Sequence, residues 1–353
     1  MYGACKIRLT SPLLNVEGGA VVTLRSLVLR GLLPGAGLLL AAVIASLLLG
    51  AGDVGPGRAL SVLLGGTDGD ARFTVLELRL PRTLVAVAVG LALGVAGALL
   101  QAAARNPLAE PGLLGVSAGA SFAVVVALVL GTSAATLGPY VAVLGAGAGC
   151  LLALAAARLR GAGDDPVRLV LAGAAFSGLM AAGSSVLLLV DARAADEIRF
   201  WTIGSVAGRE LADLWAVVPV VGLGLLLAVL VAPSLTALSL GDDVATGLGH
   251  RPGRVRALAV TAVALLVGGA TALAGPVAFV GLVVPFAARA LVGPDLRRLL
   301  AVSVLIGPAT VLTADVVSRI VARPYEMPLG VMTALLGAPV LVAVVRSHRL
   351  PSL

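Results

Sequence analysis

The chain has few charged residues and few aromatic residues. Of its 353 residues, 12% are charged and 3% are aromatic, whereas 59% are hydrophobic and the mean hydropathy is +1.09. Ordinary soluble domains carry about 25% charged residues, so water is not the solvent for most of this surface. The composition excludes a soluble globular protein and predicts an all-α polytopic membrane protein.

Lysine is almost absent, and Lys6 in the N-terminal tail is the only one in the chain. A P-loop needs a lysine on the β- and γ-phosphates of its nucleotide, so this chain holds no nucleotide site of that type. If ATP drives the protein, another subunit binds it, and we expect no cofactor in this chain. No basic stripe interleaves with aromatic residues, so the net charge of +7 does not indicate a nucleic-acid partner.

Groups that could form a catalytic or metal centre are also scarce. Cys5 lies in the N-terminal tail and Cys150 inside an apolar run, so a disulfide is not expected. The two histidines, His250 and His348, fall in polar segments. These residues predict neither a metal site nor a proton relay, and no nucleophile cluster supports an enzyme.

The predicted spans contain almost no charge at their centres. A charged side chain there costs about 2.5–3.5 kcal/mol on insertion scales, so it persists mainly for function. The exception is Asp315, four residues before Arg319, a spacing at which the two side chains can pair on a helix. A self-neutralising pair, a conformational or docking role, and an ion-coupling site all remain open for it.

The apolar runs predict ten transmembrane helices, since a span needs about 20 apolar residues. Residues 1–31 form a predicted cytoplasmic tail, and residues 32–353 form one transmembrane domain. The eighth span is short and Pro285 interrupts it, so nine spans is the alternative. The predicted spans are residues 32–52, 83–103, 113–131, 138–159, 167–190, 214–235, 257–275, 277–291, 299–320 and 328–346.

Arginine placement predicts the orientation. With ten spans, most basic residues fall on the side of the N-terminus, as the positive-inside rule requires of cytoplasmic segments. Both termini are then cytoplasmic. Omitting the eighth span would move Arg289, Arg297, Arg298, Arg346 and Arg349 to the outside, so ten spans is the favoured count.

Residues 79–119 carry the most information in the chain. A predicted span follows the arginines Arg79 and Arg82, and a polar hinge at residues 105–112 joins it to the next span. Pro107 and Pro111 remove backbone donors and stop helices. We interpret the hinge as a structural break that re-aims the third span.

Several motifs occur together from about residue 35 to the C-terminus. They are RLPR (79–82), RNPLAEPGLLGVSAGA (105–120), FWTIGS (200–205), LGDDVATGLG (240–249), AGPVAFVGLVVP (274–285) and EMPLGVMTALLGAP (326–339). In this order and spacing the chain resembles the FecCD-type permease subunits of type II ABC importers for iron–siderophores, haem and cobalamin. The family usually has His where this chain has Phe286, and often Asp-His-Arg at residues 295–297, where this chain has Asp-Leu-Arg.

The resemblance implies a multi-pass permease of the bacterial cytoplasmic membrane that is not itself an enzyme. Its implied partners are membrane lipid, two ABC ATPase subunits, an extracytoplasmic binding protein and a second permease subunit, either a copy of this chain or a paralogue. Iron–siderophore uptake is the favoured function, with haem or cobalamin as the alternative. An ion-coupled secondary transporter is the competing class.

The resemblance also implies roles for particular residues. A cytoplasmic coupling loop spans about residues 236–256, and the binding protein docks on arginines at the outer side. For the coupling loop the alternative is a solvated loop, and for the arginines it is interfacial anchoring. For Pro166, an implied gate residue, the alternative is a proline that begins a helix. The implied residues are Ala245, Gly247, Leu248 and Gly249 for ATPase coupling, Arg79, Arg82 and Arg319 for docking, and Pro166 and Val167 for the cytoplasmic gate.

Overall fold

The computed structural model describes residues 28–132, 134–158, 166–322 and 325–346, and within these ranges the chain forms helices and no strands. Long apolar runs without charge favour helices, which satisfy every backbone group inside one segment. The short elements are η1 (Val28–Leu32), α3 (Pro56–Leu63), α4 (Gly69–Phe73), η2 (Thr74–Arg79), η3 (Pro111–Leu114) and α11 (Asp242–Gly247). The longer helices are α2 (Leu33–Leu48), α5 (Leu80–Ala104), α6 (Val116–Val129), α7 (Ala134–Arg158), α8 (Pro166–Val190), α9 (Ala192–Ile203), α10 (Leu211–Ser239), α12 (Pro252–Ala274), α13 (Val280–Val292), α14 (Leu296–Val321) and α15 (Leu329–Arg346).

Membrane-spanning length is reached by six helical stretches among the described residues: Leu29–Leu48, Gly69–Ala104, Leu171–Val190, Leu211–Ser239, Pro252–Ala274 and Leu296–Val321. Four shorter apolar stretches are Val116–Val129, Pro139–Leu152, Val280–Val292 and Leu329–Ala343. The prediction of a multi-pass, all-α membrane protein is therefore confirmed. The count of ten spans and the position of the termini stay predictions.

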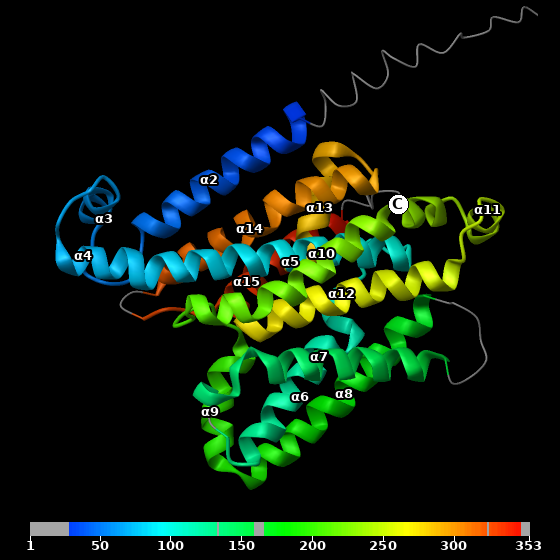
Figure 1. Ribbon diagram of the computed structural model, residues 1–353, viewed down its shortest axis with the longest axis horizontal. Coiled ribbons are helices and arrows are strands. Elements are labelled where there is room, and N and C mark those ends of the chain that lie inside the picture. Colours follow the sequence, from blue (N-terminus) through cyan, green and yellow to red (C-terminus); the bar gives the residue numbers. More distant parts are fainter. Residues whose placement is uncertain (1–27, 133, 159–165, 323–324, 347–353) are drawn as a thin grey trace, which may run out of the picture.

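The helices lie roughly along the long axis of the molecule, with α3 and α4 at one end and α11 at the other (Figure 1). Helices α5, α10, α12 and α14 pack side by side, and α6, α7 and α8 form a second group that joins them through α12. We refer below to the α3–α4 end and the α11 end.

Helix α5 is the centre of the fold, and small residues let its neighbours approach closely. A Cβ added at Gly90 would lie 2.5 Å from the carbonyl oxygen of Gly307 on α14. A Cβ added at Gly97 would lie 1.9 Å from the carbonyl oxygen of Gly281 on α13. Membrane helices associate by such close packing because lipid provides no hydrophobic force between them.

Helices α6 and α13 are short because each follows a segment without α-helix that enters the helix bundle. Helix α5 ends at Ala104, and Arg105 takes the left-handed conformation with φ 47°. The chain then runs back beside α5, so that Pro111 contacts Gly281 close to the Leu93 carbonyl. Seven residues separate Gly97 from Ala104, which places this contact roughly 10 Å inside the end of α5. The predicted hinge is present, and it is deeper than a surface turn.

The interruption of the eighth span lies before α13 and not at Pro285. Residues 275–279 are non-helical, and Pro285 sits inside α13 without ending it. A proline within a helix leaves the carbonyl four residues earlier without its usual donor. That carbonyl belongs to Gly281, the residue that packs against Gly97. Irregular backbone at membrane depth is tolerated where protein buries it, and here α5 and the hinge surround it.

Candidate functional site

Arg79 ties the α3–α4 end together from inside. Its Nη1 donates to the carbonyl oxygens of Leu47 and Leu48 at 3.0 and 2.9 Å, and its Nη2 donates to that of Val54 at 2.9 Å. The residue is 5% exposed. Its guanidinium therefore caps the end of α2 and orients the loop that leads to α3.

Asp315 joins two arginines from different helices. Arg82 on α5 donates to both carboxylate oxygens of Asp315 on α14, with the closest contact at 2.7 Å, and also donates to Glu326 at 2.7 Å. Arg319 donates to Asp315 one helical turn away and to Ser46, whose carbonyl oxygen lies 3.0 Å from Nη1. We call these residues, Arg82, Asp315, Arg319 and Glu326, the charge cluster.

Little of the three predicted docking arginines lies on the surface. Arg319 is 2% exposed and Arg79 is similarly buried, whereas the Arg82 side chain is partly exposed beside the more exposed Glu326. Direct contact with a partner is therefore open to Arg82 in this structure and closed to the other two. Their docking role stays a prediction.

Glu326 also lines an open cavity of about 810 Å³, together with residues of α9 and the start of α10. It is mixed in character, because apolar side chains such as Trp201 and Met327 line it together with charged residues. Burial lowers the pKa of Arg209, which lies between α9 and α10, and the negative charge of Asp213 partly offsets that effect. The charged residues that line it are Glu197, Arg209, Glu210, Asp213 and Glu326.

Helix α11 is a short helix at the opposite end of the bundle, fixed by its first residue. Asp242 accepts hydrogen bonds from Arg105 and, at 2.9 Å, from Arg256, so its carboxylate joins the end of α5 to the start of α12. Gly241 and Gly249 have φ of 117° and 83°, conformations that favour glycine and that begin and end the segment.

Two apolar side chains of α11 point away from the protein. Ala245 is fully buried, while Val244 is 48% exposed and Leu248, at the end of the helix, is 61% exposed. Of the predicted coupling residues, Ala245 anchors the helix and Leu248 is available to a partner. Sequence reasoning missed Val244, although its spacing of four residues from Leu248 places both on one face.

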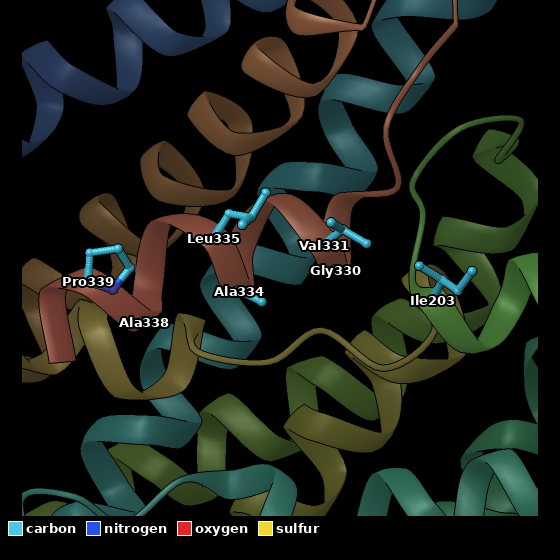
Figure 2. Close-up of a pocket in the computed structure, with 7 residues that line it drawn as sticks. All are labelled: Ile203, Gly330, Val331, Ala334, Leu335, Ala338 and Pro339. Atoms are coloured by element: carbon cyan, nitrogen blue, oxygen red, sulfur yellow. The ribbon is translucent and has the colours of Figure 1, made fainter. Parts of the chain in front are cut away.

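Helix α15 has an open apolar surface next to the end of α9. Figure 2 shows its residues Gly330 to Pro339 beside Ile203, where they line a depression of about 560 Å³. The Gly330 N–H donates to the Gly204 carbonyl at 3.2 Å, and a Cβ at Gly330 would lie 2.1 Å from the Ile203 carbonyl oxygen. The motif FWTIGS thus meets EMPLG here, which explains why glycine is needed in both.

The predicted gate residues have a less complete description. Pro166 is the first residue of α8, in agreement with a proline that begins a helix. The placement of the Pro166 and Val167 side chains lies outside what the structure describes.

Two polar contacts inside the bundle were not predicted. The carboxylate of Glu110 in the hinge accepts a hydrogen bond from the Phe279 N–H, and Arg289 on α13 donates to the Gln101 side chain on α5 at 3.0 Å. Phe286, where the related permeases usually have His, packs with its ring centre 5.8 Å from the Arg289 guanidinium. Among the described residues, no group of three or more His, Cys, Asp or Glu side chains could hold a metal ion.

Comparison with known proteins places these features in a transport context. Residues 38–347 match the FecCD transport family. The ferric enterobactin transport system permease protein FepD of Escherichia coli (strain K12) is 42% identical over 330 residues, which cover 93% of this chain and 97% of the relative. The probable siderophore transport system permease protein YfiZ of Bacillus subtilis (strain 168) is 37% identical over 273 residues, 77% of this chain and 82% of the relative.

A solved structure has the same fold. It is described as an inward-facing conformation of a metal-chelate type ABC transporter, and it matches with a TM-score of 0.76 and 29% identity. The match covers 90% of this chain and 98% of that chain. The arrangement of α5, the hinge and α13 is therefore part of a known transporter architecture.

Proposed function

The chain belongs to the FecCD transport family, and we propose that it is the membrane-spanning permease subunit of a bacterial ABC importer for iron–siderophore complexes. The observation that carries this proposal is the 42% identity to a ferric enterobactin permease along 97% of its length. The other similar proteins include permeases named for iron(3+)-hydroxamate and Fe(3+) dicitrate. A permease for haem or cobalamin is the alternative.

We infer that the chain crosses the bacterial cytoplasmic membrane ten times, with both termini in the cytoplasm. The four shorter apolar helices supply the spans beyond the six long ones. The basic residues support the orientation, because Arg251, Arg254 and Arg256 lie beside α11, at the end proposed to be cytoplasmic. The α3–α4 end then faces outward.

We propose that α11 is the contact through which two ATPase subunits drive the permease. The exposed Val244 and Leu248 supply an apolar surface that a groove on an ATPase can bury. Asp242 connects this surface to α5 through Arg105 and to α12 through Arg256. Movement of α11 is thereby passed to the most buried helix of the fold.

At the opposite end we propose that an extracytoplasmic binding protein docks around Arg82 and Glu326. Arginine forms paired hydrogen bonds with carboxylates, and Arg82 is the partly exposed member of the predicted set. Arg79 and Arg319 contribute by holding α2, the α3–α4 segment and α14 in position beneath that surface.

We propose that a second permease subunit, a copy or a paralogue, faces α8 and α15 across the transport pathway. Exposed leucines on these helices include Leu179 and Leu189 of α8 and Leu335 of α15. The depression in Figure 2 adds an apolar wall whose lining residues carry no charge. Pro166 and Val167, where α8 begins, are the proposed cytoplasmic gate. Such a wall binds no substrate tightly, which suits a pathway that must release its cargo.

An uptake assay tests the function. The chain, its ATPase and its binding protein would be reconstituted in vesicles loaded with ATP, and entry of radiolabelled ferric siderophores would be followed. We expect uptake that stops when the ATPase is inactivated and persists when the proton gradient is collapsed. Uptake that follows the gradient instead would identify a secondary transporter, and uptake of haem or cobalamin alone would identify the alternative cargo.

A further inference from the structure

A cavity at the α11 end of the bundle contains a buried guanidinium with an unused donor. The cavity has a volume of about 500 Å³, within the range of roughly 300–1,000 Å³ typical of small-molecule sites. It lies where α5, α10 and α13 end and α14 begins. Its polar lining residues are Arg105, Thr236, Ser239, Arg289, Asp295 and Arg298.

Arg289 has a buried hydrogen-bond donor that a ligand could satisfy. It is 6% exposed, its Nη2 donates to Gln101 at 3.0 Å, and its Nη1 is buried without a hydrogen-bond partner. An unpaired buried donor costs free energy, more so when it carries charge. An anion in the cavity would supply the missing acceptor and neutralise the charge.

The other polar groups of the cavity favour an anion over a cation. Arg298 adds a second positive charge, and its distance of 4.0 Å from Asp295 makes that pair a loose one. Asp295 accepts the Arg298 N–H at the start of α14, so its carboxylate is already engaged. Arg105 is engaged by Asp242. With three arginines against one lining carboxylate, the net charge of the cavity wall is positive.

The surroundings of the cavity favour a lipid as the source of that anion. Val229, Pro233 and Thr236 on α10, and Leu240 at its C-terminal cap, lie on one face at spacings of three and four residues. All four are exposed, so an apolar stripe leads along the helix directly to Thr236 at the cavity wall. An acyl chain can lie on this stripe while its headgroup enters the cavity. Basic pockets between helices at one membrane face are typical sites for such headgroups.

We propose that this cavity binds the phosphate headgroup of an anionic phospholipid, with Arg289 and Arg298 as its donors. The bound lipid would connect the ends of α10 and α13 to the start of α14 and stabilise their packing. This site does not depend on the cargo of the importer, so the two proposals can fail separately.

Native mass spectrometry of the purified full-length chain in detergent provides the test, with phosphatidylglycerol as the probe. We expect Arg289→Gln to weaken phosphatidylglycerol binding about tenfold, the effect of losing one charge-assisted hydrogen bond. The matched control is Arg254→Gln, which removes one exposed arginine at the same end outside the cavity. It should leave the affinity within about twofold.

A second variant covers the case in which Arg289→Gln does not fold, because Arg289 also bonds to Gln101. Arg298→Gln alters a half-exposed residue and should still weaken binding several-fold relative to Arg254→Gln. Phosphatidylcholine binding as strong as phosphatidylglycerol binding would overturn the proposal. Complete displacement of phosphatidylglycerol by inorganic phosphate alone would overturn it too. Displacement of phosphatidylglycerol by the ATPase subunit would show that the cavity accepts an acidic protein segment instead, and the lipid assignment would fail.

Discussion

The Glu110 carboxylate lies 2.7 Å from the backbone nitrogen of Phe279 and accepts its hydrogen. The two residues belong to the two segments without α-helix that enter the bundle, one before α6 and one before α13. Phe279 has φ 68°, a conformation that non-glycine residues rarely adopt and that costs about 1–3 kcal/mol. The hydrogen bond from Glu110 is therefore a contact that helps to hold this strained turn at the start of α13.

Changing Glu110 tests whether the contact needs charge or only an acceptor. Glu110→Gln keeps an acceptor oxygen and should retain most transport, whereas Glu110→Ala leaves the Phe279 N–H without a partner. We expect Glu110→Ala to lower stability by about 1–3 kcal/mol and to reduce uptake. Thermal unfolding in detergent and uptake in vesicles would measure the two effects. Equal loss in both variants would show that the contact needs the charge, and wild-type behaviour of both would show that it has no role in holding the turn.

The packing of α5 on α13 predicts a large effect from one methyl group. A Cβ at Gly97 would fall 1.9 Å from the Gly281 carbonyl oxygen, so Gly97→Ala must push the two segments apart. Overpacking of this kind costs about 1–3 kcal/mol or more. In the matched control, Gly222→Ala on α10, the added Cβ meets nothing within 4 Å and should stabilise the helix by up to about 1 kcal/mol. Comparable melting temperatures for the two variants would contradict the close contact.

The charge cluster predicts a strong dependence of stability on Asp315. Asp315→Asn would leave Arg82 and Arg319 without their shared buried carboxylate, and breaking a buried pair costs about 3–5 kcal/mol. Asp196→Asn is the control, since its pair with Arg199 is exposed and surface pairs contribute little. If the two variants unfold at the same temperature, the cluster is not a structural element, and Arg82 and Arg319 return as free docking candidates.

Much of this arrangement could be predicted from the sequence, and the reasons are physical. Apolar runs determine where helices form in lipid, and Pro107 and Pro111 correctly predicted a break. The partners of Arg82 lie 233 and 244 residues away in the chain, so no local pattern could have predicted that they turn it inward. The depth of the hinge was missed for the same reason, since it depends on Gly97 and Gly281 fitting together.

The α3–α4 end provides a prediction about pH. Arg58 donates to both carboxylate oxygens of Asp68, at 2.7 and 3.0 Å, and this contact lowers the pKa of Asp68 from its usual value to about 2. A lowered pKa means that the pair stabilises the segment fully above the ordinary pKa near 3.8 and loses that effect as pH falls through about 2. Arg58→Gln should therefore increase hydrogen exchange of residues 56–73 already at pH 5, where the wild-type pair is intact. After correction for the intrinsic exchange rate, wild-type protein should show no increase between pH 6 and pH 5 and a rise below the ordinary pKa near 3.8, and equal exchange of the two proteins at pH 5 would contradict the pairing.

The exposed face of α11 gives the most direct test of how this chain is driven. Leu248 and Val244 protrude from a helix that Ala245 and Asp242 hold in place, so a charge at Leu248 spoils the apolar contact without disturbing the fold. We expect Leu248→Asp to abolish co-purification with the ATPase and uptake together, and Val244→Asp to weaken both. Leu64→Asp is the matched control, because Leu64 is an even more exposed leucine at the α3–α4 end. If Leu248→Asp still binds the ATPase and still transports, the coupling surface lies elsewhere. If it binds but no longer transports, α11 transmits movement without providing the affinity, which assigns the coupling to the Asp242 contacts with α5 and α12.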